Sequence, residues 1–176
     1  MSATEEFVSR CITAATEDKA MIAVKEVVEQ ALCDKRVEAD LSSDVGLRVL
    51  HLSDDLTVIN VVAPKRSDYA LPRRPHDHRM WAVIGIMQGQ EDNEFFRRSE
   101  DTIVPAGGRL LDEGDVLVLG SDMIHSVGNP SANRLTCALH VYGGDLLNAA
   151  RSMWNEPDWR EEPYDVKRVT GTTFAE

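Results

Sequence analysis

The sequence is poor in the features that mark several protein classes. Its 176 residues include only three cysteines, Cys11, Cys33 and Cys137, which are far apart and form no Cys-x-x-Cys pair. Neither a disulfide framework nor a thiolate zinc site is therefore indicated. No apolar run approaches the length that crosses a bilayer. Because the first residues are acidic where a secretory signal would be basic, we expect a cytoplasmic protein without membrane contact.

Positive charge is also scarce. The chain has 19 lysines and arginines against 30 aspartates and glutamates, a formal net charge of −11, and no dense basic run. Proteins that bind nucleic acid or anionic membranes do so by neutralising phosphates, so neither partner is expected here. A small molecule is the expected partner, and the sequence leaves open whether the chain forms a homo-oligomer.

The segment 1–45 has the pattern of helices. Its apolar residues recur at spacings of three and four, and they are Met21, Val24, Val28, Ala31 and Leu32. Side chains that can cap a helix, near Thr16 to Asp18, predict a break into two helices. We expect these helices to pack on the main body of the protein and to carry no chemistry.

The segment 46–145 has the pattern of short strands. Leu47–Leu52 and Leu56–Ala63 flank a polar turn and predict a hairpin. Further strands are predicted at 81–87, 95–96, 102–104, 116–119 and 134–142, with turns at 107–108 and 113–115. Strands spaced in this way are typical of a mainly β sandwich or barrel. Residues 146–176 are predicted to form a short helix and an irregular arm, within one domain overall.

Three of the five histidines lie in two patterned segments. His76 and His78 are two residues apart, so on a strand their imidazoles leave the same face. The second segment has Gly114, Gly120, Asp122, His125 and Asn129 at characteristic spacings. An isolated His-x-His is most often exposed polar alternation, but two such segments together indicate a metal site. No motif surrounds His51.

The two segments resemble the paired motifs of the cupin superfamily. This resemblance implies a double-stranded β-helix, or jelly-roll barrel, preceded by the N-terminal helices, with a metal on His76, His78 and His125. The cupin pattern would place a glutamate ligand four residues after His78, where this chain has Ala82. Three neutral imidazoles would leave about three open positions on the ion. That arrangement favours Fe(II), a chelating anion and O₂ over zinc, which normally keeps one open position.

Among cupins, the sequence resembles the thiol dioxygenases, which include cysteine dioxygenase and bacterial 3-mercaptopropionate dioxygenase. The matching stretches are 75–78, 81–84, Gly89-x-Glu91-x-Asn93, 124–125 and 139–145. The resemblance implies oxidation of a small carboxylate-bearing thiol to its sulfinate on iron, with Tyr142 and His140 as a hydrogen-bonding pair at the open face. It also implies that Arg151 binds the carboxylate. Other arginines are candidates for that role, namely Arg79 and, as further rivals, Arg73, Arg74, Arg97 and Arg98.

Some positions depart from this family. Ala138 stands where the family has serine, Arg79-Met80 replaces Gly-Thr, Ala82 replaces glycine, and no cysteine lies near Ala82 to crosslink with tyrosine. These changes crowd or re-polarise the pocket, so a thiol larger than 3-mercaptopropionate, or a substrate other than a thiol, is left open. Two alternatives also stay open: another three-histidine cupin dioxygenase, for example one that cleaves a diketone, and a non-catalytic cupin that binds a small ligand.

Overall fold

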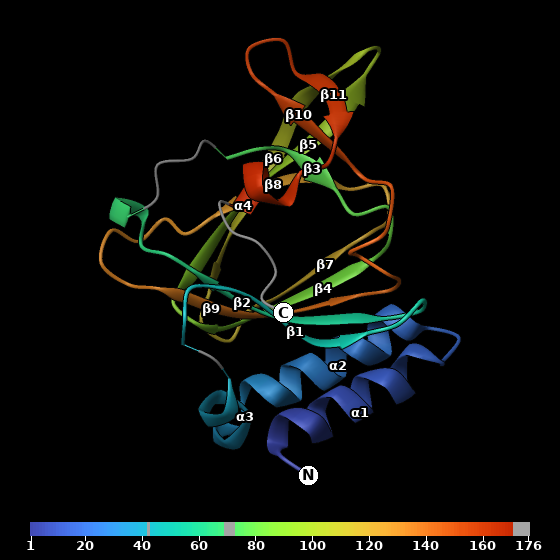
Figure 1. Ribbon diagram of the computed structural model, residues 1–176, viewed down its shortest axis with the longest axis vertical. Coiled ribbons are helices and arrows are strands. Elements are labelled where there is room, and N and C mark those ends of the chain that lie inside the picture. Colours follow the sequence, from blue (N-terminus) through green and yellow to red (C-terminus); the bar gives the residue numbers. More distant parts are fainter. Residues whose placement is uncertain (42, 69–72, 171–176) are drawn as a thin grey trace.

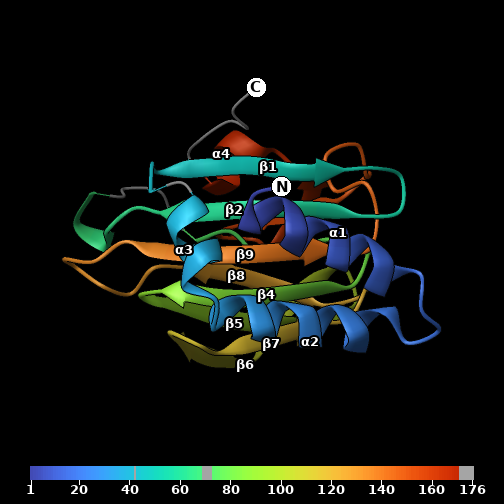
Figure 2. The ribbon, with the colours of Figure 1, turned by 90° about the horizontal axis from the view of Figure 1, so that it is seen from below.

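The computed structural model describes residues 1–41, 43–68 and 73–170. Two antiparallel sheets face each other, and the N-terminal helices cover the outside of one of them (Figures 1 and 2). The covered sheet consists of β1 (Gly46–Leu52), β2 (Thr57–Ala63), β9 (Thr136–Tyr142), β4 (Ala82–Gln88) and β7 (Val116–Leu119), in that order. The predicted hairpin of β1 and β2 is confirmed.

The second sheet contains six strands. Their order is β11 (Arg160–Pro163), β10 (Ser152–Asn155), β3 (His76–Asp77), β8 (Ile124–Gly128), β5 (Gln90–Ser99) and β6 (Thr102–Asp112). From β3 to β10 the chain passes back and forth between the two sheets, except at the β5–β6 hairpin. This winding is that of a jelly roll. The predicted fold, a mainly β jelly-roll barrel with N-terminal helices, is therefore confirmed.

The helices attach to the barrel through an apolar face of α2. Helix α1 (Ala3–Ala15) and helix α2 (Ala20–Leu32) are separated at the predicted break, and a short α3 (Lys35–Asp40), which was not predicted, follows. Val24 and Val28 of α2 are fully buried in a cluster with Val83 of β4. Gly85 permits this approach, since a Cβ there would lie 2.5 Å from Cγ1 of Val28.

The glycine pair 107–108 does not form the turn that the sequence predicted. Both residues lie inside β6, and Gly107, with a φ of 128°, pairs with Phe95 where the register between β5 and β6 shifts. The glycines therefore allow a bulge in a continuing strand. A bulge and a turn need the same backbone freedom, which explains the wrong prediction.

The C-terminal region also differs from the prediction. Strands β10 and β11 form a hairpin where a helix and an irregular arm were expected, so Arg134–Tyr142 does not contain the last strand. Met153 and Trp154 are fully buried, and Met153 pairs with His76 of β3. The sequence signal failed because this pairing joins segments far apart in the chain. The only helix described in this region is α4 (Val166–Thr170).

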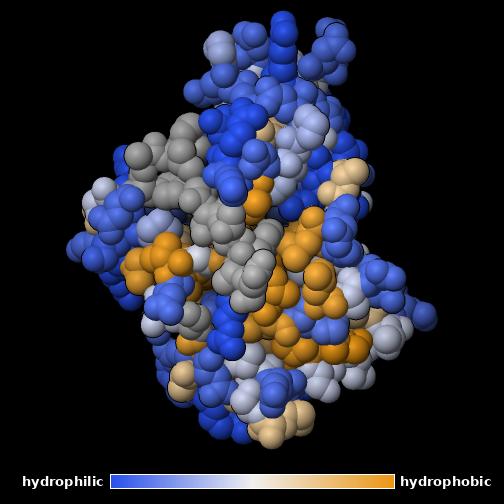
Figure 3. Space-filling view, viewed as in Figure 1, coloured by the Kyte–Doolittle hydropathy of each residue, from blue (hydrophilic) through white to orange (hydrophobic). Residues whose placement is uncertain are grey.

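The surface changes character along the long axis of the molecule. Figure 3 shows hydrophilic side chains over the end that carries the β10–β11 hairpin, whereas apolar ones gather over the middle of the same face. Ion pairs link strands at the hydrophilic end, for example Arg98 of β5 and Glu161 of β11, whose Nη1 and Oε2 atoms are 2.6 Å apart. Within the described part of the chain, no helix has the length and apolarity to span a bilayer.

Candidate metal centre and substrate cavity

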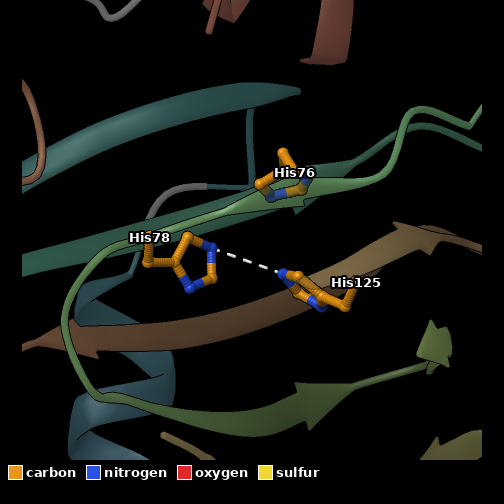
Figure 4. A group of neighbouring side chains, drawn as sticks. All are labelled: His76, His78 and His125. Carbon is orange, nitrogen blue, oxygen red and sulfur yellow. Dashed lines mark hydrogen bonds between the residues drawn. The ribbon is translucent and has the colours of Figure 1, made fainter. Parts of the chain in front are cut away.

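Strand pairing brings the three motif histidines together. His76 lies on β3, His78 follows that strand, and His125 on β8 pairs directly with His76. All three side chains are buried, and one nitrogen from each lies within 4.8 Å of the other two. Figure 4 shows the rings converging from two segments of chain, with the Nε2 atoms of His78 and His125 3.3 Å apart.

Hydrogen bonds behind two of the rings fix their orientation. Nδ1 of His76 lies 3.0 Å from the carbonyl oxygen of Arg74, and Nδ1 of His125 lies 2.8 Å from Oδ1 of Asn93. Both partners are acceptors, so each Nδ1 carries the hydrogen and each Nε2 keeps a lone pair for the centre of the group. This is how proteins orient histidines that bind metals.

Burial keeps the three imidazoles neutral. Desolvation, the largest cause, lowers the pKa of His76 to about 4 and those of His78 and His125 well below their usual value, and the neighbouring histidines lower the latter two further. Metal ions bind the neutral form of imidazole, so no proton has to be removed at neutral pH. The donor set therefore fits a divalent transition metal.

The group of candidate ligands is made of histidines alone. Among the described residues, no carboxylate or thiol joins His76, His78 and His125 within ligand distance. Ala82, at the position of the cupin glutamate, is fully buried in an apolar cluster with Ile84 and Leu119. An ion held here would therefore keep its full charge toward the cavity.

A cavity of about 730 Å³ opens beside this group. Its polar wall combines two of the motif histidines with other ionisable side chains, namely His76, His78, His140, Tyr142, Glu91, Arg151, Tyr164, Arg66, Asp68 and Arg73. Leu47, Ile59, Val61 and Leu146 supply an apolar wall. The cavity is therefore bounded by a candidate metal site, by charged side chains and by hydrocarbon.

His140 and Tyr142 reach this cavity together. They are two residues apart on β9, so both side chains leave the same face of the sheet. Nδ1 of His140 lies 2.9 Å from Oη of Tyr142, and the tyrosine ring packs edge-on against His78 with the ring centres 4.9 Å apart. Burial raises the pKa of Tyr142, so the phenol keeps its hydrogen.

Arg151 is a buried cation in the cavity wall. Its side chain is 8 % exposed, and its guanidinium stacks on the ring of Tyr164 at 3.7 Å from the ring centre. Nε has no hydrogen-bond partner, and none of the described carboxylates forms an ion pair with this arginine. A buried charge without a counterion is costly, and an anionic ligand would remove that cost.

Arg79 does not lie with the other candidate site residues, contrary to the prediction. Asp77 leaves β3 on the opposite face from His76, and its Oδ2 lies 2.6 Å from Nε of Arg79. Nη2 of Arg79 also contacts Glu161 at 3.2 Å. The arginine therefore ties β3 to the β10–β11 hairpin behind the site and is not part of the cavity wall.

The rival arginines differ in their surroundings. Arg73 lines the cavity but pairs with Asp92 at 2.7 Å. Arg74 hydrogen bonds to the side chain of Asn155, Arg98 pairs with Glu161, and Arg97 is exposed on β5. Arg151 therefore combines burial with a free donor.

Two residues of the cavity wall had no role assigned from the sequence. Glu91 lies in one of the stretches that resemble the thiol dioxygenases. It is two residues before Asn93 on β5, a spacing that places both side chains on the same face of the strand. Tyr164 gave no signal, because it follows β11 in a segment expected to be irregular. Its backbone nitrogen donates to the carbonyl of Arg151 at 3.0 Å, which brings the stacked pair together.

No family model matches the sequence. Solved structures that overlap with the fold include the DMSP lyase DddQ from Ruegeria pomeroyi DSS-3, with 24 % identity, a TM-score of 0.41 and coverage of 56 % of this chain and 43 % of that one. An RmlC-like cupin family protein from Methanocaldococcus jannaschii has 12 % identity and a TM-score of 0.47, over 62 % of this chain and 91 % of the other. The hydroquinone 1,2-dioxygenase PnpCD, in complex with Cd²⁺ and 4-hydroxybenzonitrile, has 15 % identity and a TM-score of 0.42, over 62 % and 71 %.

These neighbours include a cupin family protein and two enzymes. The aligned region is less than half the length of the Ruegeria lyase. Each of these structures aligns with only part of this chain. The strand order therefore defines the fold, and the arrangement of the side chains defines the site. The chain is thus a jelly-roll protein with a buried three-histidine group able to hold a metal ion.

Proposed function

We propose that the protein is a non-haem Fe(II) thiol dioxygenase, which adds both atoms of O₂ to the sulfur of a small carboxylate-bearing thiol and forms the sulfinate. One observation carries this proposal. The buried guanidinium of Arg151, without an acid partner among the described residues, lines the same cavity as His76 and His78. A ligand that satisfies both ends needs an anionic group, such as a carboxylate, at one end and a metal-binding group at the other.

The residues of the cavity have distinct roles in this proposal. His76, His78 and His125 hold the ion through neutral nitrogens, and bound Fe(II) supplies the charge that stabilises a thiolate and the redox chemistry with O₂. Arg151 binds the carboxylate through its planar fork and so fixes the position of the sulfur. Such fixed orientation accounts for a large part of a catalysed rate.

The size of the cavity bears on the substrate. At about 730 Å³ it falls in the range of pockets that hold drug-sized ligands, so a three-carbon thiol would fill only part of it. Leu47, Ile59 and Val61 would contact the remainder of a longer molecule. A thiol with a carboxylate and an additional apolar part therefore fits better than 3-mercaptopropionate itself.

The test is oxygen consumption by the iron-loaded protein. We expect thiol-dependent uptake of O₂ and a sulfinate product, identified by mass, when 3-mercaptopropionate, cysteine, mercaptosuccinate and longer mercapto acids are compared with cysteamine, which lacks the carboxylate. His125→Ala should abolish the uptake, whereas His51→Ala, outside the group, should retain it. Bound iron with no response to any thiol would overturn the proposal, and O₂ uptake with a diketone would then identify a carbon-oxidising cupin.

A further inference from the structure

Glu91, His140 and Tyr142 form a buried row in the cavity wall. Tyr142 Oη lies 2.9 Å from Nδ1 of His140, and on the other side of the ring Nε2 lies 3.6 Å from Oε2 of Glu91. The last separation is an ion-pair distance and is too long for a hydrogen bond. Nε2 of His140 is fully buried and has no hydrogen-bond partner among the described residues. Glu91 is therefore the group that this nitrogen faces.

The carboxylate of Glu91 is held in place from behind. Its Oε1 accepts a hydrogen bond of 2.9 Å from Nδ2 of Asn93, whose Oδ1 lies against Nδ1 of His125. Glu91 is 4 % exposed and lies on β5, two residues before Asn93. One carboxylate oxygen is thus engaged by Asn93, and the other is directed at His140.

The position of the hydrogen on His140 follows from this arrangement. A neutral imidazole has one N–H group and one lone pair. A lone pair on Nε2 would face a carboxylate at 3.6 Å and be repelled, whereas an N–H group would be attracted, and the low dielectric of the interior strengthens both effects. In the neutral ring the hydrogen therefore belongs on Nε2, which leaves Nδ1 as an acceptor.

We infer that Glu91 is a positioning residue, which fixes His140 in the tautomer with hydrogen on Nε2, so that Tyr142 donates its hydroxyl hydrogen to His140. The phenol has a single hydrogen, so the cavity then meets only lone pairs of the tyrosine oxygen. Tyr142 is thereby an acceptor toward any ligand, although a phenol can in principle act in either direction.

Because Tyr142 donates its hydrogen to His140, the tyrosine oxygen selects the chemical group that a ligand places beside it. A thiol S–H or a hydroxyl can donate to the tyrosine oxygen, whereas a thioether or a carbonyl at the same place would meet lone pair with lone pair. The selection of an S–H group applies to the thiol before it binds the metal as a thiolate, and it rests on the proposed function. The tautomer of His140 does not rest on the proposed function, because it depends on Glu91 alone.

The test is the ¹⁵N spectrum of the imidazole rings in the metal-free protein at neutral pH. Signals of His140 are assigned by their loss in His140→Asn. We expect the hydrogen on Nε2 in the wild type. A wild-type spectrum with the hydrogen on Nδ1, or on both nitrogens, would by itself overturn the inference.

Glu91→Gln gives a second, isosteric test. The amide oxygen can keep the hydrogen bond to Asn93, which turns the NH₂ group toward His140 and demands a lone pair on Nε2. The hydrogen should then move to Nδ1, and the two nitrogen resonances should exchange their protonated and unprotonated positions. Glu94→Gln, an exposed change on the same strand, should leave the spectrum unchanged. An unchanged tautomer in Glu91→Gln would contradict the role of Glu91, while an absence of thiol oxidation would affect only the proposed function.

Discussion

His78 and His125 face each other through nitrogens that are 3.3 Å apart. Nε2 of His125 has a lone pair, since its Nδ1 hydrogen is directed at Asn93, so without a metal Nε2 of His78 must carry a hydrogen. His78 could offer Nε2 to a divalent ion by carrying its hydrogen on Nδ1 instead. His78 and His125, two of the candidate ligands, are therefore already close together without a metal.

Binding of a metal should stabilise the fold. At a free concentration of 100 times Kd, an ion that binds only the folded protein adds about 2.7 kcal/mol to the free energy of unfolding. We expect a higher Tm when Fe(II) is added without oxygen, and loss of this shift in His78→Ala. His51→Ala serves as the control and should show the full shift. A full shift in His78→Ala would exclude that histidine as a ligand.

Asn93 should tune the affinity for the metal. Its Oδ1 orients the ring of His125, and removal of such a partner typically weakens metal binding about 10- to 100-fold. We expect this loss of affinity for Asn93→Ala in a competition titration with a chelator. Glu94→Ala on the same strand has an exposed side chain and should bind as the wild type does. Equal affinities in the two variants would show that the hydrogen bond to His125 does not matter for binding.

Arg151→Ala should separate binding from chemistry. A hydrogen bond to a charged group contributes about 1.5 to 3 kcal/mol, so KM for a mercapto acid should rise about 10- to 100-fold, with a smaller change in kcat. Cysteamine has no carboxylate and should be affected little. Arg97→Ala, an exposed arginine of β5, is the matched control. An equal effect on both substrates would mean that Arg151 supports the fold and does not bind the carboxylate.

The metal-free protein should lose stability as the pH falls below about 6.5. Burial lowers the pKa of His76 to about 4, so between these values the unfolded chain binds more protons than the folded one. Stability is therefore complete above the unfolded pKa and declines toward the folded pKa. His76 alone accounts for about 3 kcal/mol, at roughly 1.4 kcal/mol per pKa unit. Denaturant unfolding from pH 7 to pH 5 measures the slope, which His76→Gln should reduce.

Gly85 should be intolerant of even a methyl group. A Cβ at this position would lie 2.5 Å from Cγ1 of Val28, which is fully buried. Crowding of this kind in a packed core costs about 1 to 3 kcal/mol. We expect Gly85→Ala to lower the urea midpoint and Val28→Ala, introduced into the same protein, to relieve part of the loss. Additive effects in the double variant would show that the two sites do not interact.

The sequence predicted the parts of the site that depend on local spacing. The alternation along a strand brings His76 and His78 to one face, and the same rule joins His140 to Tyr142. The sequence could not reveal contacts that depend on the pairing of strands far apart in the chain. Arg79 has the same charge as Arg151, and its contacts with Asp77 and Glu161 show that it is engaged elsewhere.

The misread elements have a similar cause. Gly107 allows a bulge in one setting and a turn in another, and the partner strand β5 decides between them. Strand β10 pairs with β11 and, through Met153, with His76 of β3. The second pairing joins segments far apart in the chain, which no local pattern encodes. Glu91 and Tyr164 became interpretable only when their neighbours were known.

The pairing of Met153 with His76 also determines where the chain can change in length. Residues 147–150 form no strand, so an insertion there would enlarge a surface loop and leave Arg151 attached to the β10 register. An insertion between Arg151 and Met153 would instead move the guanidinium by one residue relative to His76. An insertion before Arg151 therefore leaves the distance between Arg151 and His76 unchanged, whereas an insertion after Arg151 changes it.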